Sequence, residues 1–352
     1  MPTLFIDTQP LKNVNTGMGQ VCLNLGTELI RQRPPGWDIT FLVPKGKVGF
    51  FGPTVQYRVA TEWLRHWRPS GYEVWHCLHQ GSKFLPARSS ALVYTILDLN
   101  YLIHPSYTDK QKAKQKKRYQ ARVDQASVIT TISQYVADDV RQQLVVPTTT
   151  PVSVTYLGAH VPPDAHTLTP SFRPDGPFLL FMGVVDPRKN VHTLLPILEA
   201  YPNYYLVLAG DPKPDYAAQM LATAQEMGIA DRLILPGTVD EATKWWLYAH
   251  CEAFLFPSLL EGFGLPVVEA MALGKPVFSS DHMSLPEVGG PDTFYFRSFE
   301  QQDMVETFRQ GMTTYLSDPT YPDRLRHFSQ QFRWENVAAT YWKIYQGLVS
   351  KQ

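Results

Sequence analysis

Short apolar runs, separated by turn residues and by stretches with helical spacing, recur along the whole chain. In the first half the runs are Thr3–Asp7, 39–43, Val74–Cys77, Ala91–Ile96, 127–131 and 152–156. In the second half they are Phe178–Met182, Tyr205–Ala209, 233–235, 254–256 and 277–278. Runs of this length are typical of buried strands that crossover helices connect in a parallel sheet. The pattern therefore predicts an α/β protein built from two Rossmann-like halves.

Prolines interrupt this pattern near the middle of the chain. Residues 160–177 have little hydrophobic periodicity and contain Pro162, Pro163, Pro170, Pro174 and Pro177. Such a segment is typical of a linker. We therefore expect a first domain over residues 1–165, a second over 175–332, and a final amphipathic helix in 333–352.

The first strand runs into a glycine-containing loop and then a helix. Gly17 and Gly19 lie in this loop, within residues 9–20, and helical spacing follows from Val21 onward. The arrangement predicts the opening unit of a Rossmann-like half, with the glycines either at a ligand or in a plain tight turn. The loop lacks the GxGxxG spacing of nicotinamide-binding proteins, which argues against an oxidoreductase.

Residues 254–287 carry the most informative pattern. A buried strand leads into a loop where Gly262 and Gly264 flank Phe263, and a helix with Glu269 follows. Parallel sheets bind ligands at the carboxyl ends of their strands, and a helix start can hold a phosphate. Glu269 could accept hydrogen bonds from a ribose, and Glu261 from a sugar. An ordinary strand–helix unit with solvated acids would show the same spacing.

Two cations follow the strand Phe178–Met182. After the turn at Gly183, Arg188 and Lys189 lie in residues 186–190, which lead into a predicted helix with Leu194, Leu195 and Leu198. Arginine offers a planar fork of donors and lysine a compact charge, a combination that suits a diphosphate. A solvated basic turn is the alternative.

Asp98 follows another strand, Ala91–Ile96. It could orient substrate hydroxyls or support developing positive charge, or it could simply cap the next turn. The tripeptide Asp98-Leu99-Asn100 only faintly resembles a metal-binding DxD element. His104 is a further polar candidate that could also be structural.

The amino-acid composition of the chain argues against several kinds of ligand and cell compartment. Lysine plus arginine equals aspartate plus glutamate, 32 each in 352 residues, so no strong charge points to nucleic acid. The three cysteines are far apart and outside any Cys/His cluster, which predicts a reducing compartment and no structural zinc site. Neither a signal peptide nor a transmembrane run is evident, so we expect a cytoplasmic protein that is at most peripheral to a membrane.

Segment 110–122, KQKAKQKKRYQAR, is strongly basic. A solvated helix explains it. Its cations from Lys110 to Arg122 could instead contact anionic lipid at the inner face of a membrane, or a polyanionic acceptor.

The stretch PSLLEGFGLPVVEAMALGKPV resembles, over about twenty ungapped positions, the donor-sugar signature of family 4 glycosyltransferases, which are retaining enzymes of the GT-B fold. The segments Pro187-Arg188-Lys189-Asn190 and Thr95-Ile96-Leu97-Asp98-Leu99 are similar to two further motifs of that family. The resemblance implies two Rossmann-like domains that face a central cleft. The first would bind the acceptor and the second the nucleotide sugar, and the C-terminal helix would cross back to the first domain.

The resemblance also implies site residues. Those expected to take part in catalysis are Glu261, Asp98, Arg188 and Lys189. Those expected at the donor are Gly17, Gly19, Gly183, Arg188, Lys189, Gly237, Val239, Glu261, Gly262, Phe263, Gly264, Leu265 and Glu269. Leu97 stands where many relatives have a histidine that contacts the donor sugar, and His104 could replace that polar contact.

The implied reaction moves a hexose to a hydroxyl of a glycan or lipid-linked glycan, with retained configuration and without a metal or cofactor. Similarity to bacterial polysaccharide mannosyltransferases favours GDP-mannose as donor and a role in lipopolysaccharide biosynthesis. The alternatives are a UDP-hexose or UDP-N-acetylhexosamine donor, a sugar-nucleotide hydrolase or phosphorylase, and a non-catalytic sugar-nucleotide-binding module.

Overall fold

The computed structural model describes residues 1–14, 16–61 and 68–350. The chain divides into two compact units, Met1–Gly158 with Arg333–Gln352, and Ala159–Phe332. The two points where the chain passes from one unit to the other lie side by side, because the Ala159 amide donates to the Phe332 carbonyl at 2.9 Å. Gly158 allows the two chain segments to approach this closely, because a Cβ at that position would lie 2.4 Å from the Trp334 amide nitrogen.

The first unit contains a parallel seven-stranded sheet in the order β3-β2-β1-β4-β5-β6-β7. Its strands are β1 (Thr3–Asp7), β2 (Asp38–Val43), β3 (Gln56–Val59), β4 (Val74–Cys77), β5 (Ala91–Ile96), β6 (Val128–Thr131) and β7 (Val152–Val154). Strands β2 and β3 lie on one side of β1, and strands β4 to β7 lie on the other side. This reversal places a topological switch point between β1 and β4.

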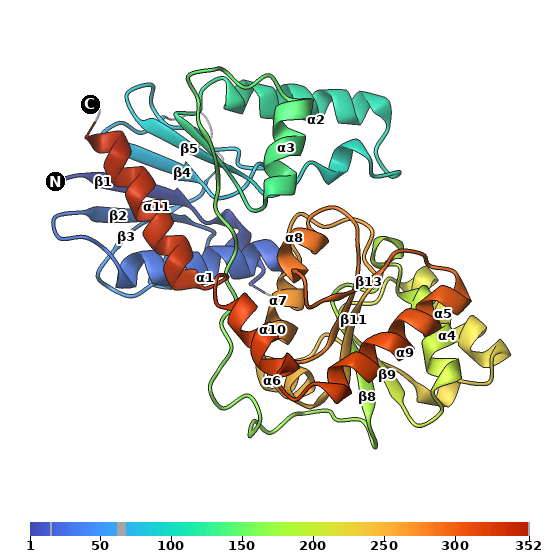
Figure 1. The fold of residues 1–352 in the computed structure, drawn as a ribbon. Helices are drawn as coiled ribbons and strands as arrows, with labels where there is room; N and C mark the ends of the chain where they lie inside the picture. The colour runs from blue at the N-terminus through green and yellow to red at the C-terminus, as the bar shows by residue number, and fades with distance from the viewer. Residues whose placement is uncertain (15, 62–67, 351–352) are drawn as a thin grey trace. The chain divides into compact units, whose positions relative to one another are not determined.

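Helices cover this sheet. They are α1 (Gly17–Arg31), α2 (Asp109–Val123), α3 (Gln134–Gln143) and α11 (Trp334–Val349), with 3₁₀ turns η1 (Gln9–Lys12) and η3 (Asn100–Leu102). The C-terminal helix α11 packs beside α1 across the sheet (Figure 1). Trp342 on α11 donates from its indole nitrogen to the Leu29 carbonyl at 3.1 Å. The last helix of the chain is therefore part of the first unit.

The second unit contains a parallel six-stranded sheet in the order β10-β9-β8-β11-β12-β13 (Figure 1). Its strands are β8 (Phe178–Met182), β9 (Tyr205–Ala209), β10 (Leu233–Gly237), β11 (Ala253–Phe256), β12 (Val277–Ser280) and β13 (Phe294–Phe296). Its longer helices are α4 (Leu195–Ala200), α5 (Pro214–Glu226), α6 (Glu241–His250), α7 (Leu265–Ala272), α8 (Leu285–Gly289), α9 (Gln301–Ser317) and α10 (Tyr321–Ser329). The 3₁₀ turns are η4 (Pro187–Lys189), η5 (Val191–Leu194) and η6 (Ala230–Arg232).

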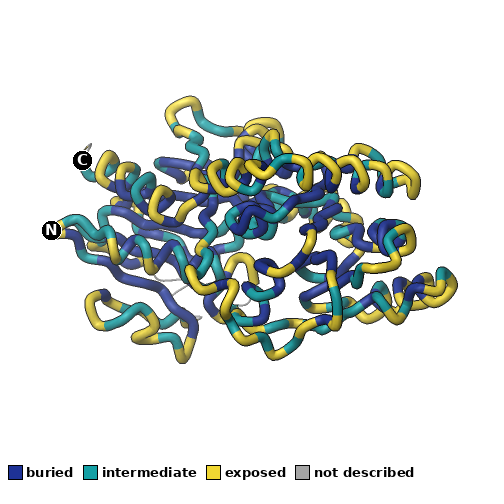
Figure 2. Tube along the Cα trace, turned by 60° about the horizontal axis from the view of Figure 1, so that its bottom comes forward, coloured by how far each residue is buried: buried dark blue, intermediate teal, exposed yellow. Residues whose placement is uncertain are grey.

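These two sheets confirm the predicted α/β class with two Rossmann-like domains. Figure 2 shows the strands as largely buried, with exposure concentrated in loops and on the outer faces of helices. The pattern missed the edge strands β3 and β13, of which β3 alternates exposed and half-buried residues. It also ended β10 too early, since that strand continues through Pro236 and Gly237.

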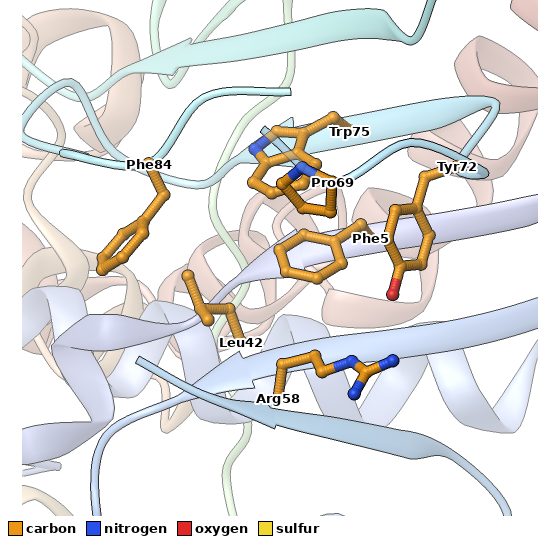
Figure 3. A pocket seen from close by; sticks show the side chains of 7 residues that line it. All are labelled: Phe5, Leu42, Arg58, Pro69, Tyr72, Trp75 and Phe84. Carbon is orange, nitrogen blue, oxygen red and sulfur yellow. The ribbon is translucent and has the colours of Figure 1, made fainter. Parts of the chain in front are cut away.

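One cavity in the first unit belongs to the core rather than to a site (Figure 3). Its volume is about 10 Å³, and the Phe5 and Trp75 rings stack beside it with centroids 3.8 Å apart. A space of this size holds about one water molecule, so it cannot admit a sugar.

No helix within the described residues is long and apolar enough to span a membrane.

Candidate functional site

The predicted donor residues of the second unit lie at a switch point of its sheet. Strands β9 and β10 extend the sheet on one side of β8, and the chain then returns to place β11 on the other side. The loops that leave β8 and β11 therefore start side by side at the carboxyl edge, the position where open α/β sheets bind ligands. Arg188 and Lys189 follow β8, and Glu261 follows β11.

Lys189 and Glu261 meet at this edge. The Lys189 ammonium forms an ion pair with Glu261 Oε1, and the two side chains are only 14% and 15% exposed. The ammonium also lies 5.2 Å from the centre of the Phe256 ring. Limited exposure strengthens the electrostatic interaction relative to a surface pair. The structure thus brings together two residues that lie 72 positions apart.

Arg188 sits in a different local environment. Asp186 caps the 3₁₀ turn η4 by accepting from the amides of Arg188 and Lys189. It also accepts from the Arg188 guanidinium, with Nη2 at 2.6 Å from Oδ2. Asn190 then adopts a left-handed conformation, with φ 56°, and ends the turn. A 3₁₀ turn therefore presents both cations, and the predicted helix around Leu194, Leu195 and Leu198 follows after Asn190 as η5 and α4.

The loop between Glu261 and Leu265 is fixed through its backbone. The Ser284 hydroxyl lies 3.0 Å from the carbonyls of both Glu261 and Phe263. Gly264 has φ 113°, and a Cβ there would lie 2.7 Å from a Leu285 methyl group. Only glycine suits that position. Helix α7 begins at the next residue without a side-chain cap, and the amides of Val267 and Val268 donate to the Gly264 carbonyl.

Gly262 belongs to the same loop, and Glu269 lies on α7. Lys244 on α6 binds Glu269, with 2.7 Å between the ammonium and Oε1, and the side chains are 18% and 13% exposed. Burial alone would lower the pKa of Lys244, but the charges of Glu269 and Glu241 together with this hydrogen bond raise it. Lys244 is therefore charged at neutral pH. Sequence reasoning found Glu269 but missed Lys244.

Two further predicted glycines bring loops close together at this edge. Gly183 follows β8, and its carbonyl oxygen would lie 1.9 Å from a Cβ at Gly210. The Gly210 amide in turn donates to the carbonyl of Gly237, at 2.9 Å, at the end of β10. Val239 lies in the loop after that strand. Gly210 must therefore be a glycine for the loops after β8, β9 and β10 to lie this close together.

In the first unit, Gly17 and Gly19 lie at the start of α1. Thr16 caps this helix, its hydroxyl accepting from the Gly19 amide at 3.1 Å. A Cβ at Gly19 would lie 2.1 Å from the Asn13 carbonyl oxygen, whereas a Cβ at Gly17 would meet nothing within 4 Å. Gly19 is thus required for the turn itself.

Asp98 follows β5 and accepts from the Asn100 amide at 3.0 Å, which is the capping role considered for it. The Gln80 side chain donates to the Asp98 carbonyl at 3.1 Å and accepts from the Leu97 amide at 3.0 Å. Leu97 is buried. Gln80 therefore fixes this loop, and no sequence motif pointed to it.

His104 lies later in the same loop. Its Nδ1 is 2.8 Å from the Ser106 hydroxyl, so the imidazole forms a hydrogen bond with a residue two positions along the chain.

Among the described residues, no three His, Cys, Asp or Glu side chains are grouped so that they could hold a metal ion.

Comparison with known proteins identifies the second unit. Residues 169–332 match the model of the family "Glycosyl transferases group 1". The chain is 30% identical over 239 residues to the serotype-specific mannosyltransferase WbdA of Escherichia coli, a match covering 62% of this chain and 28% of that protein. It is 29% identical over 227 residues to the O-antigen chain mannosyltransferase B of E. coli, and this match covers 60% of this chain and 58% of that protein. The chain thus spans 28% of the length of the first relative and 58% of the second, less than two thirds of either.

Among solved structures, Anabaena Alr3699/HepE in complex with UDP-glucose superposes with a TM-score of 0.72 at 16% identity, and the match covers 100% of both chains. Identity this low establishes the fold alone. The predicted GT-B fold and the family resemblance are both confirmed. Residues 169–332 form a glycosyl transferases group 1 domain, within a chain that has the GT-B fold of two Rossmann-like units.

Proposed function

We propose that this protein is a retaining hexosyltransferase that moves a sugar from a nucleoside diphosphate to a hydroxyl of a glycan or lipid-linked glycan. The observation that carries the proposal is the meeting of Lys189 and Glu261 at the switch point of a glycosyl transferases group 1 domain. One side chain has the charge to bind a diphosphate, and the other can accept hydrogen bonds from sugar hydroxyls. Both come from strand-end loops where such ligands bind.

The reaction breaks the bond between the anomeric carbon and the phosphate oxygen and forms one to the acceptor oxygen. The leaving diphosphate gains negative charge, which Arg188 and Lys189 would stabilise most in the transition state. With departure and attack on the same sugar face, the departing phosphate oxygen takes the acceptor's proton. No side-chain nucleophile is then required, and Asp98 would orient substrate hydroxyls from the first unit.

We propose GDP-mannose as the donor, because two relatives of this chain are mannosyltransferases. The structural neighbour that holds UDP-glucose makes a UDP-hexose the alternative. Thermal unfolding with a panel of nucleotide sugars tests both. A true donor should raise the melting temperature, since a ligand at 100 times its Kd stabilises the folded state by about 2.7 kcal/mol.

The same panel separates the function classes. Release of free sugar without an acceptor would indicate a hydrolase or, with inorganic phosphate, a phosphorylase. Donor binding without transfer to any glycan acceptor would indicate a binding module. If no nucleotide sugar stabilises the protein, the proposed function is wrong.

We further expect turnover to continue in EDTA. Protein cations supply the positive charge that a metal would otherwise bring to the diphosphate, so chelation should change the initial rate by less than ~twofold. Initial rates with and without EDTA, after dialysis, measure this. Complete loss that magnesium restores would contradict metal-free transfer.

Helix α2 is proposed as a contact for an anionic membrane surface. Lys110, Lys114 and Lys117 are exposed and three or four residues apart, so they share one face of the helix. Reversing all three to glutamate should weaken binding to phosphatidylserine vesicles on the order of 100-fold, because each cation contributes about 1 kcal/mol near such a surface. Co-sedimentation with vesicles at low and physiological salt measures the loss.

A variant with the same change of net charge elsewhere provides the control. Arg173, Arg297 and Lys343 are also exposed, and their reversal should leave vesicle binding near that of the wild type. Arg118 is excluded from the test set, because its guanidinium donates to the carbonyls of Gly81 and Ser82 and has a structural role. Equal loss in both variants would mean that net charge, not α2, governs binding.

A further inference from the structure

The segment between β12 and α8 fixes the backbone of the loop that carries Glu261. At the end of β12, the Ser280 hydroxyl donates to the Ser258 carbonyl. At the start of α8, the Ser284 hydroxyl donates to the Glu261 carbonyl. Between these two serines, the sulfur of Met283 accepts a hydrogen bond from the Glu261 amide, with 3.2 Å between nitrogen and sulfur. One short segment therefore holds both backbone polar groups of Glu261.

Met283 has a backbone conformation that methionine rarely adopts. Its φ is 54°, and among the described residues Asn190 is the one other non-glycine residue with a positive φ. The Leu285 amide donates to the His282 carbonyl at 3.1 Å, which closes a turn. Within this turn Ser284 has φ −78° and ψ −11°. A positive φ at the second residue of such a turn favours glycine, asparagine or aspartate. Methionine thus occupies a position that the turn alone would give to glycine.

The sulfur contact explains why a side chain is present at this position. Backbone strain persists where surrounding contacts maintain it, and strained residues gather at functional sites. The two left-handed non-glycine residues of the described ranges both adjoin the Lys189–Glu261 pair, since Asn190 follows Lys189 and Met283 contacts Glu261. A thioether is a weak acceptor on a flexible, unbranched side chain. Glycine would relieve the strain but would remove the acceptor from the Glu261 amide.

We propose that Met283 is a positioning residue for sugar transfer, which holds the Glu261 backbone so that the carboxylate meets the donor sugar beside Lys189. The proposal rests on the function proposed above, in which Glu261 accepts hydrogen bonds from the sugar. Met283 acts through the Glu261 amide rather than on the substrate. It lies outside the stretch that resembles the donor-sugar signature, so it adds a residue to the site that this stretch does not contain.

Three substitutions of Met283 separate the role of the sulfur from the requirements of the turn. Met283→Gly suits the positive φ but removes the acceptor. Met283→Leu retains a side chain of the same length, also without an acceptor. Met283→Asn suits the turn and places an amide oxygen at the same number of bonds from Cα as the sulfur. Only the asparagine variant can therefore bind the Glu261 amide in place of the wild-type side chain.

Kinetics and hydrogen exchange together test this role. Met283→Gly and Met283→Leu should lower kcat/KM about 10-fold to 100-fold, because a small misplacement of a positioning group has effects of this size. Met283→Asn should retain most of the wild-type value. Calorimetric affinity for GDP or UDP, according to the donor found in the panel, should change less than ~threefold, because neither ligand carries the sugar. Without donor, overlapping peptides across 258–264 should show faster exchange at the Glu261 amide in the glycine and leucine variants.

Met227→Leu is the matched control, because Met227 is another half-buried methionine of the second unit, at the end of α5. It should behave as the wild type in every measurement. Wild-type kcat/KM in Met283→Gly would show that Met283 only completes the turn and would overturn the proposal. An equal loss in Met283→Asn and Met283→Leu would also overturn it, since the acceptor would then be irrelevant. If the wild type transfers no sugar, the proposed function fails, and exchange at the Glu261 amide still decides whether Met283 holds the loop.

Discussion

Replacing Lys189 with alanine should lower kcat/KM about 100-fold to 1,000-fold, a loss of ~2.7–4 kcal/mol of transition-state stabilisation, as for other preorganised charge-stabilising groups. The substitution removes a cation aimed at the leaving diphosphate, and it leaves the largely buried Glu261 carboxylate without its partner. Both effects act against binding of the anionic donor. Steady-state kinetics with the donor found in the panel, at saturating acceptor, measure the change.

Lys213 provides a matched control in the same unit. Its amide bonds to the loop after β8, and its ammonium pairs with Asp211 at 2.8 Å, but its side chain is 54% exposed. Exposed pairs contribute little, so Lys213→Ala should behave like the wild type. A double-mutant cycle with Lys189→Met and Glu261→Gln isolates the coupling within the pair. Similar kcat/KM values for Lys189→Ala and Lys213→Ala would remove Lys189 from the donor site.

Arg188 should show a smaller loss than Lys189. The Arg188 guanidinium donates two hydrogen bonds to the Asp186 carboxylate. A diphosphate must therefore compete with a nearby carboxylate for the same donors. We expect Arg188→Ala to weaken donor binding more than ~10-fold, or about 1.4 kcal/mol, by calorimetry. Unchanged affinity would show that Asp186 retains Arg188 in the complex.

Local pattern was sufficient to predict much of the second unit. Gly264 has a positive φ next to a helix start, and a glycine followed by leucine and proline indicates that geometry in the sequence itself. The loops after β8 and β11 were predicted at strand ends from apolar runs of buried residues. The sequence near each loop does not indicate that the two loops are neighbours, because this depends on the order of the strands around β8.

What sequence reasoning missed shares one physical property. Lys244 meets Glu269, and Gln80 holds the backbone at Asp98, through contacts between separate elements. A lysine in a helix and a glutamine after a strand both resemble ordinary surface residues when read alone. Only tertiary packing brings them to their partners. The edge strand β3 was missed for a related reason, since its half-exposed residues lack the continuous apolar run of a central strand.

Acid should destabilise the docking of the C-terminal helix through His76. This residue on β4 is fully buried, with Nδ1 2.6 Å from the Tyr345 hydroxyl of α11 and Nε2 2.8 Å from the Thr95 hydroxyl of β5. Burial lowers the pKa of His76 from its ordinary 6.5 to about 3. The unfolded chain therefore binds the proton first on acidification. The free energy of unfolding should have its full value above pH 6.5 and decrease as the pH drops toward 3. The total decrease should be up to about 5 kcal/mol, since each pKa unit of difference corresponds to ~1.4 kcal/mol.

Hydrogen exchange followed by mass spectrometry can localise this loss, because peptides from Trp334–Val349 and Val74–Cys77 report on the two elements that His76 joins. In the wild type, protection of both peptides should decrease between pH 7 and pH 5 after correction for the intrinsic exchange rate. His76→Gln retains a hydrogen-bonding side chain but cannot titrate, so its protection should be lower at pH 7 and nearly independent of pH. His327→Gln, at an exposed position, should follow the wild type. An equal pH dependence in His76→Gln and the wild type would show that another group couples α11 to acid.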